Sequence, residues 1–285
     1  MRTAMLMGCF LLLACGKGKA PAPAVSAAPA GGDASALEAE AVALWAERVD
    51  ETKLAAALGK YDEVRAADPA NRAALVRLTR GWYFFGDGFT TDKTIQAERW
   101  QKAIAAGESC LNLNEEYAKR IAAGEKPKDA VGATTKADVP CLYWYSTALG
   151  KWSRTQSISV TLKHLSTVKA FIGRVEELQA DFFNYGPARY WGAYNIGVPF
   201  GKDPEKSEQY FQASIDGAPW YLATRVLRAE FLHVYNRDRA KFEEDLKFVI
   251  DADPNSNPDA DVGAENVREK NKAKTLLSRA DELFD

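Results

Sequence analysis

Ser166 and Lys169 are the residues of this chain whose types and spacing come nearest to a catalytic pair. They match the S-x-x-K pattern, in which a lysine helps a serine to attack an acyl group. Enzymes that use this pattern also carry S-D-N and K-T-G segments, and the sequence contains neither. The H-E-x-x-H, C-x-x-C, G-x-S-x-G and Walker A patterns are missing as well. Because His164 and His233 are the only histidines and lie far apart in the chain, we expect no enzymatic activity, no metal site and no cofactor.

The composition is typical of a globular protein. The 285 residues include 37 Lys+Arg and 39 Asp+Glu, a formal net charge of -2, and 47% are hydrophobic. These proportions exclude a disordered chain, a collagen and a small disulfide-rich scaffold. The near-neutral charge argues against a protein dedicated to nucleic acid, which needs a large basic surface. The length allows a sizeable buried core.

The N-terminal segment predicts an export signal that ends in a modified cysteine. Arg2 precedes an apolar run from Thr3 to Ala14, which is shorter than the run of about 20 residues that a membrane-spanning helix needs. The run ends in Leu-Leu-Ala-Cys, which is similar to the lipobox of bacterial lipoproteins and implies removal of residues 1–14 and lipidation of Cys15. The alternative is an ordinary signal peptide in which Cys15 is incidental. Two acyl chains anchor a protein stably to a membrane.

Residues 15–36 are expected to form a tether between this anchor and the folded part of the protein. The segment is rich in Ala, Pro, Gly and Ser and has no hydrophobic periodicity, so it cannot bury a core. Gly16 follows the cysteine, and the sorting rule known for some Gram-negative lipoproteins then favours the outer membrane. We therefore expect a lipid-anchored protein of the bacterial cell envelope that faces the periplasm, with one folded domain at 37–285.

The folded domain is predicted to be all-α. Alternating β-branched runs are missing, apolar residues recur at helical spacing, and Ala, Leu, Glu, Lys and Arg dominate. Pro- and Gly-containing breakers divide the domain into about eleven expected helices. One of these breakers, Gly86-Asp87-Gly88, predicts the C-terminal end and turn of a helix.

Three segments resemble the second helix and following turn of a tetratricopeptide repeat. They are Lys60–Asn71, Ser207–Pro219 and Ala240–Pro254, and the interval between the last two prolines is close to the repeat length of about 34 residues. The proline of each is expected in the first turn of the next helix, where its missing N–H costs nothing. Since residues 124–139 interrupt the spacing, we expect an irregular tetratricopeptide-like α-solenoid with a concave surface.

Two cysteines of the domain are predicted at the same end of a helical hairpin. Cys110 lies near the end of one expected helix and Cys141 at the start of the next. An exported protein would permit their oxidation to a disulfide. The alternative is that both are small buried hydrophobic residues.

Aromatic residues gather in three runs in the irregular middle of the chain. A helix with four aromatic residues in a row presents them around most of its circumference, so it packs on several sides or lines an apolar channel. Core packing is the ordinary explanation of such residues. The second hypothesis is a pocket for an apolar ligand, in which an arginine would meet an acidic group of the ligand. The candidate ligand-binding residues are Trp82, Tyr83, Phe85, Trp144, Tyr145, Trp152, Arg189, Tyr190, Trp191 and Tyr194.

Together, the lipobox, the tether and the degenerate helical repeats resemble the TRAP transporter T-component (TatT) lipoproteins. The resemblance covers 37–285, and its aromatic and Gly-rich motifs are Leu78–Gly88, Leu142–Trp152, Asp181–Tyr194 and Asp281–Phe284. It implies a lipoprotein that works with the periplasmic substrate-binding protein of a TRAP-type transporter. It also implies a bore or cleft for a small hydrophobic or organic-acid ligand, and self-association.

Two functions remain open from the sequence. The first is a ligand-handling accessory subunit of a TRAP-type solute uptake system, which predicts that the clusters around Trp82, Trp144 and Trp191 face a cavity. The second is a tetratricopeptide-like scaffold lipoprotein that mediates protein–protein interactions in the cell envelope, which predicts a partner but no bore.

Overall fold

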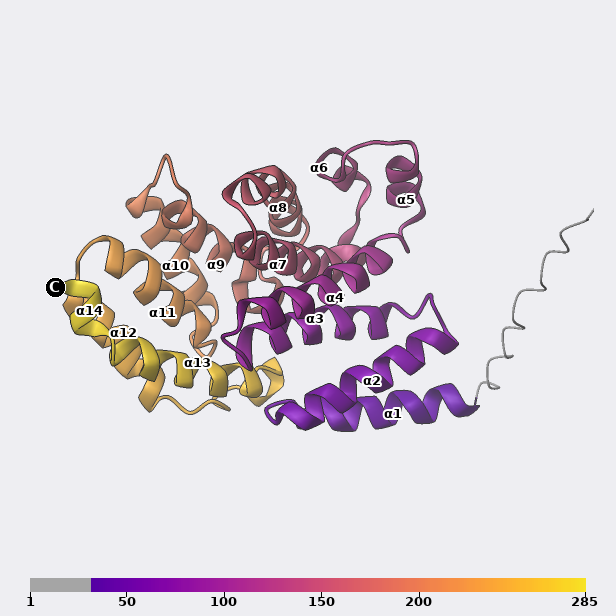
Figure 1. Ribbon diagram of the computed structural model, residues 1–285, viewed down its shortest axis with the longest axis horizontal. Coiled ribbons are helices and arrows are strands. Elements are labelled where there is room, and N and C mark those ends of the chain that lie inside the picture. Colours follow the sequence, from indigo (N-terminus) through magenta and orange to yellow (C-terminus); the bar gives the residue numbers. More distant parts are fainter. Residues whose placement is uncertain (1–31) are drawn as a thin grey trace, which may run out of the picture.

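A computed structural model describes residues 32–285 and confirms the all-α prediction (Figure 1). No β-strand occurs in this range. The signal segment, Cys15 and most of the expected tether lie outside the described residues. The fourteen α-helices of the described range are α1 (Gly32–Ala46), α2 (Glu51–Ala67), α3 (Arg72–Gly88), α4 (Lys93–Leu111), α5 (Glu115–Ala122), α6 (Pro127–Ala130), α7 (Val139–Thr155), α8 (Ile158–Gln179), α9 (Phe182–Gly197), α10 (Pro204–Gly217), α11 (Ala223–Leu227), α12 (Arg239–Asp251), α13 (Gly263–Leu277) and α14 (Ala280–Phe284).

Short helices explain why the described range contains fourteen α-helices where about eleven were expected. The interrupting segment at 124–139 is not an open loop, because it contains α6 and the 3-10 turns Val131–Ala133 and Lys136–Asp138. At the other end of the chain, α11 continues into a π-helical segment at Arg228–His233. Helices of one turn leave too short a periodic pattern to be recognised in a sequence. The helical domain also begins earlier than composition indicated, since α1 starts at Gly32, within the expected tether.

Polar residues at the helix starts explain where the long helices begin. The carboxylates of Asp50 and Asp92 each accept two backbone N–H groups of the first turn that follows. The side chains of Asn71 and Ser157 each accept one such N–H group at the start of α3 and α8. Each such cap contributes about 1 kcal/mol, because these N–H groups have no partner inside the helix.

The turns that resemble tetratricopeptide repeats differ from the expectation in one respect. Pro69, Pro219 and Pro254 lie in the connections after α2, α10 and α12, and none of them is in the first turn of the next helix. After Pro69, for example, α3 begins only behind the Asn71 cap. The prolines therefore stop a helix and shape the turn, while side-chain caps start the next helix.

The helices follow one another in a curved array, and α13 returns to its beginning (Figure 1). Arg48 after α1 and Arg80 of α3 both bind the carboxylate of Glu265 in α13, with N–O distances of 2.7 and 2.5 Å. Arg268 donates a further hydrogen bond of 2.8 Å to the carbonyl of Val49. These contacts fasten the C-terminal part to the N-terminal hairpin. None of the helices in the described range is long and apolar enough to cross a membrane.

Cys110 and Cys141 form a disulfide that joins the end of α4 to the start of α7. Their Cα atoms are 5.7 Å apart, and both side chains are fully buried. The bond closes the excursion through α5 and α6, whose two helices stand apart from the array in Figure 1. It therefore holds α4 and α7 side by side, although the two helices are not neighbours in sequence.

An unusual turn forms the beginning of α9. Phe183, Asn184 and Tyr185 all have left-handed backbone conformations, with φ of 47°, 56° and 55°. Such residues persist only where the surroundings hold them. Glycine is required next to them, because a Cβ atom at Gly186 would lie 2.5 Å from the ring of Tyr143. The right-handed part of α9 then starts around Pro187, a favourable position for proline.

Candidate functional site

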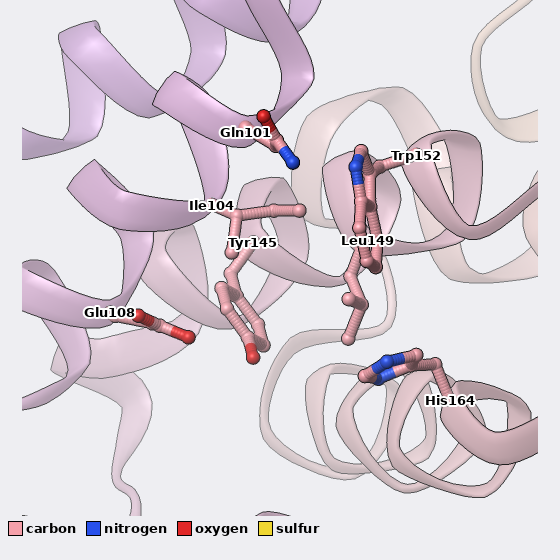
Figure 2. Close-up of a pocket in the computed structure, with 7 residues that line it drawn as sticks. All are labelled: Gln101, Ile104, Glu108, Tyr145, Leu149, Trp152 and His164. Carbon is pink, nitrogen blue, oxygen red and sulfur yellow. The ribbon is translucent and has the colours of Figure 1, made fainter. Parts of the chain in front are cut away.

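A cavity of about 230 Å³ lies between α4, α7 and α8 (Figure 2). Its walls are mostly apolar and aromatic, with a small number of polar groups. This is the usual composition of a site for a small molecule. The lining residues are Gln101, Ile104 and Glu108 of α4, Tyr145, Leu149 and Trp152 of α7, and His164 of α8.

Helical spacing explains why these residues meet. Residues three, four or seven positions apart lie on the same face of a helix, which is the relation within the α4 group and within the α7 group. The close approach of α4 to α7 depends on Gly107, where a Cβ atom would be only 2.9 Å from the Cβ of Tyr145. The disulfide fixes the same pair of helices at one end.

Two polar groups of the cavity differ in their partners within the described part of the chain. The indole N–H of Trp152 is buried and makes no hydrogen bond there. Glu108 forms no salt bridge in the same range, and burial raises the pKa of its carboxyl, an effect partly opposed by hydrogen bonding with Tyr145. A buried N–H group without an acceptor costs about 1–3 kcal/mol, so such groups call for an explanation.

His164 completes the cavity as a neutral group. Its ring packs edge-on against the ring of Trp152, with centroids 5.7 Å apart. Burial lowers the pKa of His164, and the neighbouring charge of Lys163 lowers it further. Near neutral pH the imidazole is therefore uncharged.

Trp144 lies on the other side of α7, in a closed interior. It is 4% exposed and contacts Phe183, Tyr143 and Tyr83, with ring centroids 4.5, 5.0 and 5.6 Å away. The guanidinium of Arg80 lies 5.5 Å from its ring. Trp144 and Tyr83 therefore pack as core residues and line neither of the two cavities described here.

Arg189 stabilises the left-handed turn. Its guanidinium donates to the carbonyls of Asn184 and Phe183 at 2.8 and 3.1 Å and to the hydroxyl of Tyr143 at 2.9 Å. The same group lies 4.3 Å from the ring of Tyr221. Its described hydrogen bonds thus end on neutral oxygens of the protein, and the side chain is 5% exposed. The side chain of Arg189 therefore stabilises the backbone of the turn and does not line the cavity.

The remaining predicted residues lie in two further places. Trp82 and Phe85 stack on each other and are covered by Lys102 and Arg99 of α4. Tyr190, Trp191 and Tyr194 pack on one another, and the indole N–H of Trp191 donates to Glu176 of α8 at 2.8 Å. Neither group lines the cavities described here, so the structure does not join the three aromatic clusters around one bore. Of the predicted ligand-binding residues, Tyr145 and Trp152 line the cavity.

A partly exposed ionic cluster was missed at the level of sequence. Asp87 of α3 accepts both Lys151 of α7 and Lys272 of α13, each at 2.6 Å, and Lys272 also contacts Glu269 at 3.2 Å. Burial pushes the pKa of Asp87 upward, but the two ammonium groups outweigh it and hold that pKa far below its usual range. Burial raises the pKa of Glu269. The Gly86-Asp87-Gly88 pattern correctly indicated the end of α3, but its carboxylate joins three helices, which sequence spacing cannot reveal.

A second cavity of about 170 Å³ is lined by charged groups from α10, the π-helical segment and α12. At its base, Asp245 accepts Arg225 at 2.8 Å, Arg228 at 2.7 Å and the ring of His233 at 3.2 Å. Arg228 also reaches Glu208 at 3.2 Å. Because these charges neutralise one another, we assign this cavity a structural role. In the part of the chain that the structure covers, no group of three or more His, Cys, Asp or Glu side chains is placed to hold a metal ion.

The comparisons with known proteins identify a family. A family model described as TRAP transporter T-component matches residues 48–284, which is most of the described domain. A search of curated proteins finds no match to the chain.

Proposed function

The chain belongs to the TRAP transporter T-component family, and from this premise we propose that it is a ligand-handling accessory subunit of a TRAP-type solute uptake system. In this proposal it works beside a periplasmic substrate-binding protein and passes or holds the same small solute. Lipidated Cys15 and the segment that follows it keep the domain at the membrane, facing the periplasm.

The observation that carries the ligand part of the proposal is the cavity between α4, α7 and α8. Its aromatic and aliphatic walls can contact the apolar body of a small molecule, while Glu108 and Gln101 can orient it. Gln101 and Glu108 are exposed at the surface, so a ligand can reach them from solvent.

We propose binding without chemistry at this site. Ser166 and Lys169 are both exposed on α8, outside the cavity, and the ammonium of Lys169 lies 5.0 Å from the ring of Tyr194. The cavity itself pairs no nucleophile with a base: its carboxylate comes from α4 and its histidine from α8, and no serine, cysteine or lysine is among the residues that line it.

The test is recovery of the partner from the native envelope. The full-length protein is cross-linked mildly in its own cells, purified in detergent, and its companions are identified by mass spectrometry. We expect a periplasmic solute-binding protein of a TRAP-type transporter. Recovery of envelope assembly proteins without any solute-binding protein would contradict the proposal.

A scaffold function is the second candidate, and exposed apolar side chains favour it. Ile158 and Leu162, one helical turn apart on α8, are 65% and 50% exposed, and Phe200 is 87% exposed after α9. Exposed apolar groups of this size are common at protein interfaces. In this case Phe200→Asp and Leu162→Asp should abolish co-purification of envelope partners, while Trp152→Ala should leave it intact.

A further inference from the structure

Two stretches in the middle of the chain carry positive charge and no carboxylate. Residues 139–175 and residues 182–202 contain neither Asp nor Glu, although the whole chain has a formal net charge of -2. The cations of these two stretches are Lys151, Arg154, Lys163, Lys169, Arg174, Arg189 and Lys202. Charge is therefore distributed unevenly along the chain, with a cationic region that comprises α7, most of α8, and α9.

The ends of these two stretches lie side by side. The guanidinium of Arg154, at the end of α7, lies 5.7 Å from the ring of Phe231, and a Cβ atom at Gly197, at the end of α9, would lie 3.3 Å from the same ring. The hydroxyl of Thr161 donates to the carbonyl of Ser153 at 2.9 Å, which holds the start of α8 against α7. In Figure 1, α8 and the connection between α9 and α10 lie on the same, upper side of the array. The α7–α8 turn and the α9–α10 connection therefore form one edge of the molecule.

Large apolar side chains are exposed along this edge. Ile158 and Leu162 of α8 are 65% and 50% exposed, and Phe200 in the α9–α10 connection is 87% exposed. Tyr235 is 44% exposed, and the ammonium of Lys202 lies 4.9 Å from its ring. Exposed apolar groups of this size mark a surface that contacts another molecule.

The cations beside these side chains have no carboxylate partner in the protein. The four exposed cations of the edge are Arg154, Lys163, Lys169 and Lys202. None of them forms a salt bridge within residues 32–285, whereas Lys151 nearby is paired with Asp87. Asp203, which follows Lys202, caps α10 by accepting the backbone N–H of Lys206 at 2.9 Å. The four cations are therefore available to anions outside the protein.

A bilayer with anionic phospholipids offers the matching chemistry. Its surface presents anionic headgroups to lysine and arginine, and the layer directly beneath accepts apolar side chains. Lysine is depleted in protein–protein interfaces relative to the rest of the surface. Three lysines close to Ile158, Leu162 and Phe200 therefore favour a lipid surface over a protein partner.

We propose that the edge formed by the α7–α8 turn and the α9–α10 connection docks on a bilayer surface that contains anionic phospholipids. Ile158, Leu162 and Phe200 enter the interfacial layer, and the four cations of the edge bind the phosphate groups. The inference goes beyond the transporter proposal. It rests on the proposed membrane location in one respect: a lipid on Cys15 would keep this edge close to the bilayer, so that a weak contact suffices.

The test is lysine labelling of the full-length protein on vesicles. The protein is added to preformed vesicles of phosphatidylcholine, alone or with about one-third phosphatidylglycerol, and exposed lysines are acetylated with a reagent that does not cross the bilayer. Mass spectrometry compares the three edge lysines, Lys163, Lys169 and Lys202, with Lys53 and Lys247, which are 44% and 60% exposed on α2 and α12. With anionic vesicles, we expect labelling of the edge lysines to fall about threefold relative to the two controls. It should recover in about 1 M salt, because screening weakens the contact with headgroups.

Variants at each end of the edge are read on the lysine of the other end. Phe200→Ser should restore the labelling of Lys163, and Leu162→Ser should restore that of Lys202, because either change weakens the docking of the whole edge. Phe248→Ser is the matched control. It removes a phenylalanine that is 45% exposed on α12, and the shielding of the edge lysines should be unchanged.

Three results would overturn the inference. The edge lysines are labelled equally with and without vesicles, neutral vesicles shield them as well as anionic ones, or shielding requires an added envelope protein, which would favour the scaffold function.

Flotation of the same vesicles tests the lipid anchor separately. Protein that floats with both kinds of vesicle while its edge lysines stay labelled would keep the anchor and exclude the docking edge. Flotation with anionic vesicles alone, together with shielding of the edge lysines, would support the docking edge and contradict the anchor.

Discussion

The two sides of α7 carry similar side chains, but these side chains are enclosed on one side and border a cavity on the other. Toward α3, α9 and α13, Trp144 is enclosed by other rings, and Lys151 meets the carboxylate of Asp87. Toward α4 and α8, Trp152 borders a cavity with an unpaired N–H, and Glu108 meets no cation in the described range. Around Trp144, the charged groups Arg80 and Lys151 are paired with carboxylates of the protein. At the cavity, Glu108 is exposed and its described contact is a hydrogen bond with Tyr145.

The sharpest test of this comparison replaces one tryptophan by alanine on each side of α7. Trp144→Ala should lower the free energy of unfolding by about 3–5 kcal/mol, because the closed interior cannot collapse around the lost ring. Trp152→Ala should cost about half as much or less, since one side of its ring already faces a cavity. Urea denaturation of the full-length protein gives both values. Equal losses would mean that the two sides are packed alike.

The next test neutralises one carboxylate on each side. Glu265→Gln should cost about 3 kcal/mol, because Arg48, Arg80 and Glu265 are all at least nine-tenths buried and each guanidinium would keep only Asp261 as a carboxylate partner. Glu108→Gln should change the unfolding free energy by less than about 0.5 kcal/mol, since the residue is exposed and a glutamine can still accept the hydrogen bond of Tyr145. A strongly destabilised Glu108→Gln variant would reveal a structural role for that carboxylate and weaken the case for a ligand site.

The smallest expected effect concerns acid stability. Two lysines hold the pKa of Asp87 below its unfolded value of about 4, so its contribution is complete above that pH and is lost as the pH falls toward the folded pKa. Because both lysine side chains are more than one-third exposed, we expect this contribution to be only about 1–2 kcal/mol.

The measurement is denaturation of the wild type and Asp87→Asn from neutral pH down to about pH 3. The advantage of the wild type over Asp87→Asn should shrink steadily as the pH falls below about 4. Glu243→Gln serves as the control, since that exposed carboxylate pairs with Arg239 and Lys247 at the surface. A constant difference between the wild type and Asp87→Asn over this range would show that the cluster does not depend on the charge of Asp87.

The fold class followed from sequence more completely than the site did. Helical periodicity and the missing strand patterns predicted an all-α domain, and the positions of Cys110 and Cys141 indicated that they meet at one end of a hairpin. The short helices α6, α11 and α14 were not predicted, because each spans about one turn. The packing of α13 against α3 was not predicted either, since the ion pairs that hold α13 there join residues far apart in the chain.

For the site, the sequence showed which types of residue are available, but it could not show which individual residues line the cavity. The run Tyr143-Trp144-Tyr145 was correctly singled out as a place where a helix packs on several sides. Its adjacent members point in directions about 100° apart, so periodicity could not tell which of them meets a cavity. Arg189 shows the same limit, because a left-handed turn that needs a donor for its carbonyls has no sequence pattern of its own.

The sequence by itself determined the helical class, the approximate length of the folded domain and the chemical types available to a ligand, because local backbone preference and side-chain chemistry depend on neighbours along the chain. It also determined the motifs from which the family was recognised. The tertiary structure alone decided which aromatic residues are core and which border a cavity, and which charges are neutralised. These properties depend on what packs against α7 from α3, α4, α8, α9 and α13, and such long-range contacts leave no periodic trace in the chain.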